Sequence, residues 1–249
     1  MNLWHISEDS FDPKTLTPKK LHSQETVYTI GNGYFGTRGT FEEGYRKATP
    51  ATLLFGVFDD IPVGKEELAN APDWLLIKLF VNGERFRLDK GTILEYHRIL
   101  DIYNGILTRY VHWESPNGVR LKITSERFAS LADEHVAAIR YSVTAEEQPT
   151  TGKDFDVVLR ATLNTAVGNY DLMHWETVDQ GQVNALLWLH TDSSLRCSTG
   201  TDNELHHPIT RLSDRNDGLG YCPQYSSLWD VGAWSYPDHG KDGRHVHFT

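Results

Sequence analysis

Apolar and polar residues alternate with a period of two along most of the chain, and no stretch keeps a 3.6-residue apolar period for long. The alternation is clearest in the runs "LLIKLFV", "GVRLKIT", "AAIRYSV" and "DVVLRATL". Short segments of this kind, separated by turn residues, are typical of half-buried β-strands. The pattern therefore predicts an all-β fold, a sandwich of two large antiparallel sheets with few short helices.

Two turn motifs predict hairpins within this pattern. Asn82-Gly83 separates the alternating residues 75–81 from residues 86–88, and this dipeptide favours the positive φ angles of a type I′ turn. The run "SPNG" at 115–118 precedes a return strand with the apolar residues of 119–123 on one face. We expect the register of both hairpins to be well defined.

Other segments depart from the strand pattern. Residues 64–75 could form one or two helical turns before Pro72 ends the helix. Residues 199–230 are polar and turn-rich, which predicts a long excursion or a ligand-facing loop. Alternation resumes in "RHVHFT" at 244–249. We expect this chain to be the first part of a longer protein, although a terminal strand pinned in a sheet would look the same.

The charge of the chain argues against two classes of partner. Lys and Arg number 24 against 34 Asp and Glu, a formal net charge of −10, so there is no global positive field for nucleic acid or anionic lipid. No apolar run approaches the roughly 20 residues of a membrane span, and the first residues do not resemble a secretion signal. We expect a cytoplasmic protein in which Cys197 and Cys222 are idle or buried thiols rather than a required disulfide.

The glycines of "TIGNGYFGTRGTFEEGY" spell G-x-G-x-x-G at Gly31, Gly33 and Gly36, the fingerprint of a dinucleotide-binding loop. A cofactor site would need a helix to begin at the third glycine, but Gly39 and Gly44 fall inside that helix and each costs about 1 kcal/mol there. Turns and close backbone approach explain the glycines better. The sequence thus predicts no bound cofactor.

Long stretches of the chain resemble the N-terminal domain of glycoside hydrolase family 65, which contains maltose, trehalose, kojibiose and nigerose phosphorylases and related α-glucoside hydrolases. The residues that carry the resemblance occur in the family's order over nearly the whole chain: "ETVYTIGNGYFGTRGTFEEGY", "APDWLLIKLFVNGERF", "ILEYHRILDIYNGILTRYVHWESPNG", "SERFASLADEHVAAIRYSVTA" and "HWETVD". The resemblance implies that residues 1–249 form a single N-terminal super-sandwich, similar to galactose mutarotase.

The resemblance also implies a partner and a reaction for the parent enzyme. In the family, a catalytic (α/α)6 barrel follows the sandwich and acts on an α-linked glucose disaccharide with inversion, with inorganic phosphate as a possible co-substrate. The catalytic acid and phosphate pocket lie in that barrel, which this chain does not contain. We therefore assign no catalytic residue here, and expect the domain to pack against the barrel, shape the active-site mouth and contribute to a possible homodimer.

Paired carboxylates and histidines offer no clear chemistry of their own. Glu42-Glu43, Asp59-Asp60 and Glu146-Glu147 are read as solvated loop charge, because adjacent residues in a strand point to opposite faces. His206-His207 and the pair His245 and His247 lack a third ligand at a fixed spacing, so we predict no metal site.

Four residues are candidates for contact with substrate or with the barrel. His174 could donate to a sugar hydroxyl and Trp175 could stack on a sugar, but Trp175 could equally fill the core beside a satisfied histidine. Arg38 could bind an anion, although bracing of its turn-rich segment is the first choice. Asn32 lies in the same segment and is counted with it.

Two alternatives belong to other classes of protein. A free-standing carbohydrate-binding or assembly module would bind maltose or trehalose measurably. A small enzyme of the mutarotase type would need a histidine and a carboxylate converging on one concave face. Whether the chain has any enzymatic activity of its own is left open at this point.

Overall fold

The structure is a computed structural model of the chain. It describes residues 3–60, 66–146, 156–169, 172–173, 175–183, 186–193, 196–197, 225–232, 235–238 and 245–248. Within these ranges, side chains are described up to residue 168, except at residues 59–60 and 66–67. Beyond residue 168, only the side chain of Trp175 is described. Among the described residues, no helix is both long and apolar enough to cross a membrane.

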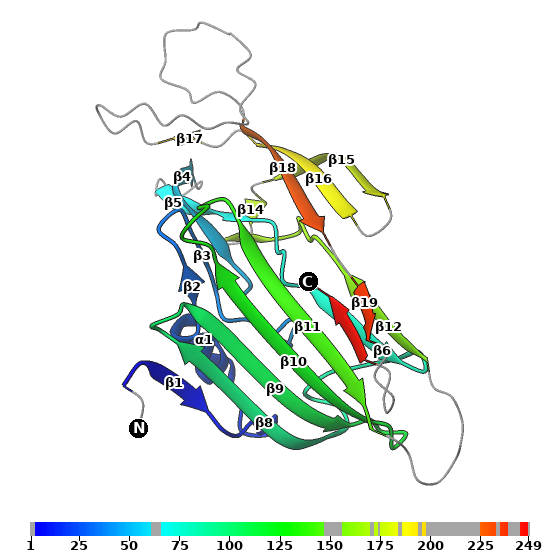
Figure 1. Cartoon of the computed structure of the whole chain (residues 1–249). Helices are drawn as coiled ribbons and strands as arrows, with labels where there is room; N and C mark the ends of the chain where they lie inside the picture. Colours follow the sequence, from blue (N-terminus) through cyan, green and yellow to red (C-terminus); the bar gives the residue numbers. More distant parts are fainter. Residues whose placement is uncertain are drawn as a thin grey trace, which may run out of the picture.

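A seven-stranded antiparallel sheet forms one layer of the molecule, in the order β1-β8-β9-β10-β11-β20-β19 (Figure 1). We call it the large sheet. Its strands are β1 (His5–Glu8), β8 (Thr92–Asp101), β9 (Ile106–Glu114), β10 (Arg120–Ala129), β11 (Ala137–Ala145), β20 (His245–Phe248) and β19 (Ser235–Asp238). The long central strands are joined by short hairpin turns, so the turns at 102–105 and 130–136 lie at the same end of the sheet.

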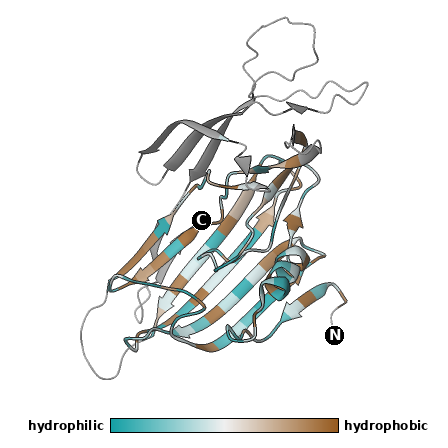
Figure 2. Cartoon of the chain, turned by 180° about the vertical axis from the view of Figure 1, so that it is seen from behind, coloured by the Kyte–Doolittle hydropathy of each residue, from teal (hydrophilic) through white to brown (hydrophobic). Residues whose placement is uncertain are grey.

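The second layer lies behind the large sheet and is built from smaller sheets (Figure 2). One has the order β12-β6-β7 and another the order β17-β4-β3-β2, with β5 pairing β4. Their strands are β12 (Val157–Ala161), β6 (Ile77–Val81), β7 (Glu84–Arg85), β17 (Arg196–Cys197), β4 (Thr52–Asp60), β3 (Phe35–Thr37), β2 (Ile30–Gly31) and β5 (Glu66–Ala71). Helix α1 (Pro18–Val27) lies on the same side of the large sheet.

The remaining strands form two small sheets, β13-β14 and β15-β16-β18. Their bounds are β13 (Gly168–Asn169), β14 (Leu172–Met173), β15 (Glu176–Val183), β16 (Leu186–Ser193) and β18 (Tyr225–Gly232). All recorded strand pairs are antiparallel, which confirms the predicted all-β sandwich.

The core lies between the layers, where the alternating apolar faces meet. Figure 2 shows brown apolar positions alternating with teal or pale ones along the strands of the large sheet. Val111, Trp113 and Leu121 from the large sheet are fully buried against Leu79 and Phe86 of the second layer. Because successive strand residues point to opposite faces, this one-sided burial is the direct consequence of the period-two pattern.

Both predicted hairpins are confirmed. Asn82 and Gly83 have φ angles of 50° and 78°, the two positive values of a type I′ turn. Phe80 pairs with Arg85 across this turn. The second hairpin joins β9 to β10, and Gly118 in its turn has a φ of 82°.

One local prediction was wrong, and one helix was not predicted. Residues 66–71 form strand β5 rather than a helix, because pairing with β4 buries Ala69 and Ala71 completely. The ten-residue helix α1 was not predicted, since Leu21 is its one buried apolar residue. Its start does carry a signal, because the Thr17 side chain accepts a hydrogen bond from Lys20 N at 3.3 Å and Pro18 stands in the first turn.

The predicted excursion at 199–230 lies mostly outside the described residues. Its last part, residues 225–230, belongs to β18 and was therefore misread as loop. Within the alternating run "RHVHFT", residues 245–248 form strand β20, which pairs with both β11 and β19.

Candidate functional site

The glycine-rich segment forms a tight hairpin. Strands β2 and β3 pair directly, with Gly31 opposite Gly36, and Gly33 takes a φ of 94° in the turn between them. A Cβ on Gly31 would lie 2.9 Å from the Phe35 carbonyl oxygen. Residues 37–60, all of which the structure describes, contain no helix, so the prediction of turns and close backbone approach is confirmed.

Asn32 connects this hairpin by hydrogen bonds to the turn at 130–136 of the large sheet. Its Oδ1 accepts hydrogen bonds from the backbone N of Tyr34 and Phe35, both at 3.1 Å. Its Nδ2 donates to the carbonyl oxygens of Ser130 at 2.8 Å and Glu134 at 2.9 Å. Asn32 therefore ties two turns together, and its proposed contact with substrate or a partner domain stays a prediction.

Arg38 braces the first helix. Its Nη1 donates to Thr26 Oγ1 at 3.0 Å, and its Nη2 donates to the His22 carbonyl oxygen at 3.0 Å and to Glu25 Oε2 at 3.3 Å. Buried Glu25 also accepts from Thr49, at 2.8 Å from its hydroxyl. These contacts agree with the bracing interpretation, while a role of Arg38 in anion binding stays a prediction.

Trp175 is buried and makes its polar contact within the chain. Its Nε1 donates to the Asn70 carbonyl oxygen at 2.6 Å, and its side chain packs with Ala69, Leu54 and Val57. Of the two roles that the sequence allowed for Trp175, filling the core and stacking on a sugar, its burial fits the first. His174 lies outside the described residues.

The metal and thiol predictions concern residues of which little is described. His206, His207 and Cys222 lie outside the described residues, and the side chains of His245 and His247 are likewise not described. Cys197 is described only as part of strand β17. These predictions therefore stay as they were.

A buried cluster of charged residues, missed by the sequence reasoning, occupies the middle of the sandwich. Arg109 donates to Glu43 Oε1 at 2.9 Å and to Glu43 Oε2 at 2.5 Å, and it also bonds Glu42 Oε2. Ser125 Oγ donates to Glu42 Oε1 at 3.0 Å, and Arg127 Nη1 lies 3.4 Å from that oxygen. We call these five residues the buried charge cluster.

The cluster corrects the interpretation of Glu42-Glu43 as solvated loop charge. The loop that carries them follows β3 and lies between the layers, because Ile77 N donates to the Glu42 carbonyl oxygen at 2.8 Å and Arg85 Nη2 donates to that of Glu43 at 2.5 Å. Outside a strand, adjacent residues need not point to opposite sides. Both carboxylates therefore reach the same guanidinium.

The electrostatics of the cluster favour ionised partners. Burial alone would raise the pKa of Glu42, but Arg109 and Arg127 outweigh it and hold this pKa below its usual value. Burial would lower the pKa of Arg109, but Glu42 and Glu43 raise it well above the ordinary value. Burial lowers the pKa of Arg127 to about 10, so Arg127 is the less fully compensated cation.

A sequence signal for this cluster existed. Arg98, Arg109 and Arg127 each stand at inward positions of strands whose other inward residues are mostly apolar, such as Tyr96 and Val111. An arginine on the apolar face of an alternating strand must find a buried partner. Counting such positions would have indicated a buried carboxylate facing the large sheet.

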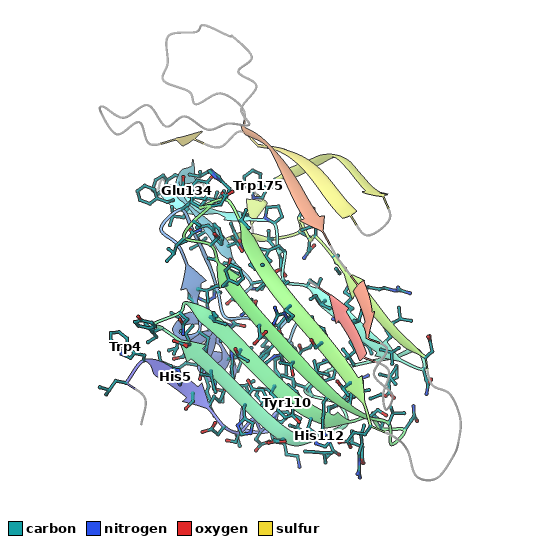
Figure 3. The ribbon with its side chains drawn as sticks, in the orientation of Figure 1. Trp4, His5, Tyr110, His112, Glu134 and Trp175 are labelled. Atoms are coloured by element: carbon teal, nitrogen blue, oxygen red, sulfur yellow. The ribbon has the colours of Figure 1, made fainter. Side chains whose placement is uncertain are left out.

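Exposed apolar side chains gather at one end of the large sheet. Ile106 pairs with both Asp101 and Phe128, so the turns beside these residues are neighbours, and Figure 3 shows Trp4 and Glu134 at the end away from His112. We call this group the end surface. It comprises Leu3, Trp4, Phe55, Ile102, Tyr103, Phe128, Leu131 and Val136, of which Leu131 and Phe55 are 86% and 75% exposed.

Backbone hydrogen bonds hold two parts of the end surface in place. Ile102 N donates to the Trp4 carbonyl oxygen at 2.8 Å, and Phe55 N donates to that of Tyr34 at 2.8 Å. The Tyr34 ring in turn lies 4.6 Å from the His135 ring, centroid to centroid. Large apolar side chains that are exposed close together are typical of a surface that a partner covers.

The outer face of the large sheet carries two histidine–carboxylate pairs. His97 lies 3.2 Å from Asp9 and 3.0 Å from Glu95, and His112 lies 3.2 Å from Glu146. They place histidines beside carboxylates on one face, whereas the mutarotase-type alternative requires the two groups to converge on a concave face. Whether the chain accelerates sugar anomerisation stays open.

Comparison with known proteins finds relatives that are named as phosphorylases. Kojibiose phosphorylase of Halothermothrix orenii is 36% identical over 177 residues, which cover 71% of this chain and 21% of that protein. Alpha,alpha-trehalose phosphorylase of Thermoanaerobacter brockii is 38% identical over 60% of this chain and 20% of its own length. Nigerose phosphorylase of Lachnoclostridium phytofermentans is 31% identical over 71% and 22%.

The chain thus matches about a fifth of the length of these relatives. A solved structure described as a putative kojibiose phosphorylase from human microbiome aligns with 99% of this chain and 32% of its own, with a TM-score of 0.64 and 19% identity. This likeness shows the fold. The model of glycosyl hydrolase family 65, N-terminal domain, matches residues 7–225, and the chain accordingly belongs to that family.

Proposed function

We propose that this chain is the non-catalytic N-terminal domain of a cytoplasmic, inverting α-glucoside disaccharide phosphorylase or hydrolase. The observation that carries the proposal is the family match over residues 7–225, together with relatives named as kojibiose, trehalose and nigerose phosphorylases. Because the chain corresponds to about a fifth of these proteins, the chemistry is assigned to a following (α/α)6 barrel.

In the proposed reaction, a carboxylic acid of the barrel protonates the glycosidic oxygen while inorganic phosphate attacks the opposite face of the α-linked glucose. In a hydrolase, a water activated by a base would take the place of phosphate. None of the steps is assigned to a side chain of this domain.

The domain contributes a docking surface in this proposal. The end surface offers exposed Leu131 and Val136 on the turn at 130–136, which Asn32 contacts, and exposed Phe55 on strand β4. This suits a barrel packed against the sandwich. The same contact would place the domain beside the active-site mouth, and a part of the surface would serve a possible homodimer.

The catalytic half of the proposal is tested by incubating the purified chain with phosphate and kojibiose, trehalose, nigerose or maltose. We expect no release of glucose 1-phosphate or glucose above the blank. Turnover by the chain alone would overturn the non-catalytic assignment. Measurable affinity for maltose or trehalose would instead favour the carbohydrate-binding module.

The docking half is tested by analytical ultracentrifugation of the isolated chain. We expect concentration-dependent self-association, because apolar area normally covered by a partner is exposed. The double variant Phe55→Ser, Leu131→Ser should sediment as a monomer. Leu94→Ser, at an exposed leucine of β8 outside the end surface, is the matched control and should associate like the wild type. A wild-type chain that stays monomeric at high concentration would count against a docking surface here.

A further inference from the structure

A cavity of about 350 Å³ lies between the start of helix α1 and the loop that follows β3. This volume is at the lower end of the range of small-molecule sites. None of its residues belongs to the end surface or to the buried charge cluster. The cavity is lined by Pro13, Leu16, Pro18, Leu21, Tyr45, Arg46, Lys47 and Asp89.

The floor of the cavity is apolar and held in place. Leu21 is buried in the core, and the half-buried Tyr45 ring makes edge contacts with Phe11 and Phe41, with ring centroids 5.9 Å and 6.0 Å apart. A fixed aromatic ring beside prolines and leucines suits the C–H face of a sugar ring.

The rim of the cavity is positively charged although the chain carries a net charge of −10. Arg46 and Lys47 are both exposed, and neither forms an ion pair with any residue that the structure describes. Asp89 is already neutralised, because Arg87 Nε donates to its Oδ1 at 2.7 Å and Arg87 Nη2 bonds its Oδ2. Two neighbouring cations without a counter-ion therefore stand over the apolar floor.

The backbone at Lys47 is held in an unfavourable conformation. Its φ is 65°, and the other non-glycine residue with a positive φ in the described part of the chain is Asn82, in a type I′ turn that demands it. His22 Nε2 donates to the Lys47 carbonyl oxygen at 2.7 Å, and Ala48 N donates to that of Tyr45 at 3.1 Å. Strain of this kind persists where the surroundings enforce it, often at ligand sites, and here it sets the cation at the rim.

We propose that this cavity binds a small phosphorylated sugar. Arg46 and Lys47 would hold the phosphate by charge-assisted hydrogen bonds, the planar guanidinium of Arg46 in a bidentate manner, while the sugar ring lies on Tyr45 and Leu16. The inference goes beyond the proposed function and does not rest on it, since its test uses this chain alone.

The test is isothermal titration calorimetry of the chain with glucose 6-phosphate, inorganic phosphate and glucose. Binding of glucose 6-phosphate more tightly than phosphate, with no binding of glucose, is the expected result and identifies a sugar phosphate as the ligand. Equal binding of both phosphates would show that the sugar ring adds nothing to binding, and would overturn the assignment of a phosphorylated sugar. Binding of glucose as tight as that of glucose 6-phosphate, or no binding of any of the three, overturns the proposal.

Three variants separate binding from folding. Lys47→Gly removes the cation and relieves the positive φ, so we expect a higher melting temperature together with about tenfold weaker binding of glucose 6-phosphate. Arg46→Ala should weaken binding by about tenfold or more through the loss of a charged hydrogen bond. Lys19→Ala, at an exposed lysine of α1 that does not line the cavity, is the control and should bind like the wild type. Undiminished binding by both cavity variants would overturn the proposal.

Discussion

The inner and outer faces of the large sheet both carry paired charges, and they differ in access to water. On the inner face, Arg109 is 3% exposed and its partner Glu43 is completely buried. On the outer face, Arg140 is 61% exposed and pairs at 3.1 Å with Glu126, which is 40% exposed. Water and salt screen the outer pair, whereas the inner one has no solvent to replace a lost partner.

The inner charges therefore fix the position of a chain segment more than they add to the net free energy of folding. A buried ion pair gains little over a well-packed apolar pair, but removing one partner leaves an uncompensated charge in the core. Glu42 and Glu43 lie on a loop, and Arg109 lies on the large sheet. The buried charge cluster therefore holds this loop in place between the layers.

The largest expected effect comes from breaking the inner cluster. Arg109→Ala should lower the free energy of unfolding by about 3–5 kcal/mol, because two buried carboxylates lose their main counter-ion. Urea denaturation followed by circular dichroism measures this loss. Arg140→Ala on the outer face is the matched control and should cost about 0–1 kcal/mol. Similar losses for the two variants would remove the distinction between the faces.

A smaller effect is expected where the loop that follows β3 packs tightly against the end of helix α1 and the Arg98 side chain. A Cβ added at Gly39 would lie 2.5 Å from Tyr28 Cβ and 2.7 Å from the Tyr28 carbonyl oxygen. Gly39→Ala should therefore destabilise the chain by about 1–3 kcal/mol, through backbone displacement beneath Arg98.

Thermal unfolding measures the cost of Gly39→Ala. Gly36→Ala is a suitable control, because the nearest atom to its added Cβ would be 3.9 Å away and its φ is not positive. Gly105→Ala would not serve, because Gly105 has a positive φ. A Gly39→Ala protein as stable as Gly36→Ala would show that the loop is not tightly packed against Tyr28 and Arg98.

The acid limb of the stability curve provides a third test. The folded-state pKa of Glu42 lies below its unfolded value of about 4.5, so its stabilising contribution is present above that pH and is lost as the pH falls through the folded pKa. The melting temperature of Glu42→Gln should therefore fall less than that of the wild type when the pH is lowered from 7 through the folded pKa of Glu42. Glu126→Gln, on the outer face, should retain the wild-type acid slope, and a change as large as that of Glu42→Gln would contradict the prediction.

The smallest effect is expected at His97 on the outer face. Hydrogen bonds to Glu95 and Asp9 raise the pKa of His97 above its usual value of 6.5. Its contribution is fully present below that pH and is lost as the pH rises through the folded pKa. An NMR titration of the imidazole should show the raised pKa, and Glu95→Gln should lower it. A titration of His97 that does not respond to Glu95→Gln would show that the exposed pair is not formed in solution.

Local patterns predicted the strands well, because each depends on few neighbours. The turn at Asn82-Gly83 and the inward faces of residues 119–123 and 139–143 followed directly from turn chemistry and alternation. Residues 66–71 were predicted wrongly, since their helical composition gave way to pairing with β4. Helix α1 was missed because it buries little apolar surface, and contacts such as Arg38 to Glu25 secure it.

The candidate site was less predictable than the fold, because it depends on contacts distant in sequence. Asn32 reaches Ser130 and Glu134 about a hundred positions away, and Trp175 reaches Asn70 at a similar separation. No local pattern contains such pairings. The cation pair at residues 46–47 could be seen in the sequence, but the apolar floor beneath it could not.

The sequence by itself determined the alternation that makes the two layers, the positions of the tight turns and the family of the chain, since these reside in neighbouring residues or in the order of motifs. The tertiary structure alone decided that Glu42 and Glu43 are buried partners of Arg109. The directions of side chains in a loop follow no backbone period and are set by the packing of the two layers around it. The tertiary structure likewise decided which turns share one end of the large sheet. Both outcomes depend on long-range packing, in which the cost of burying a charge or exposing an apolar residue is set by elements far away in the chain.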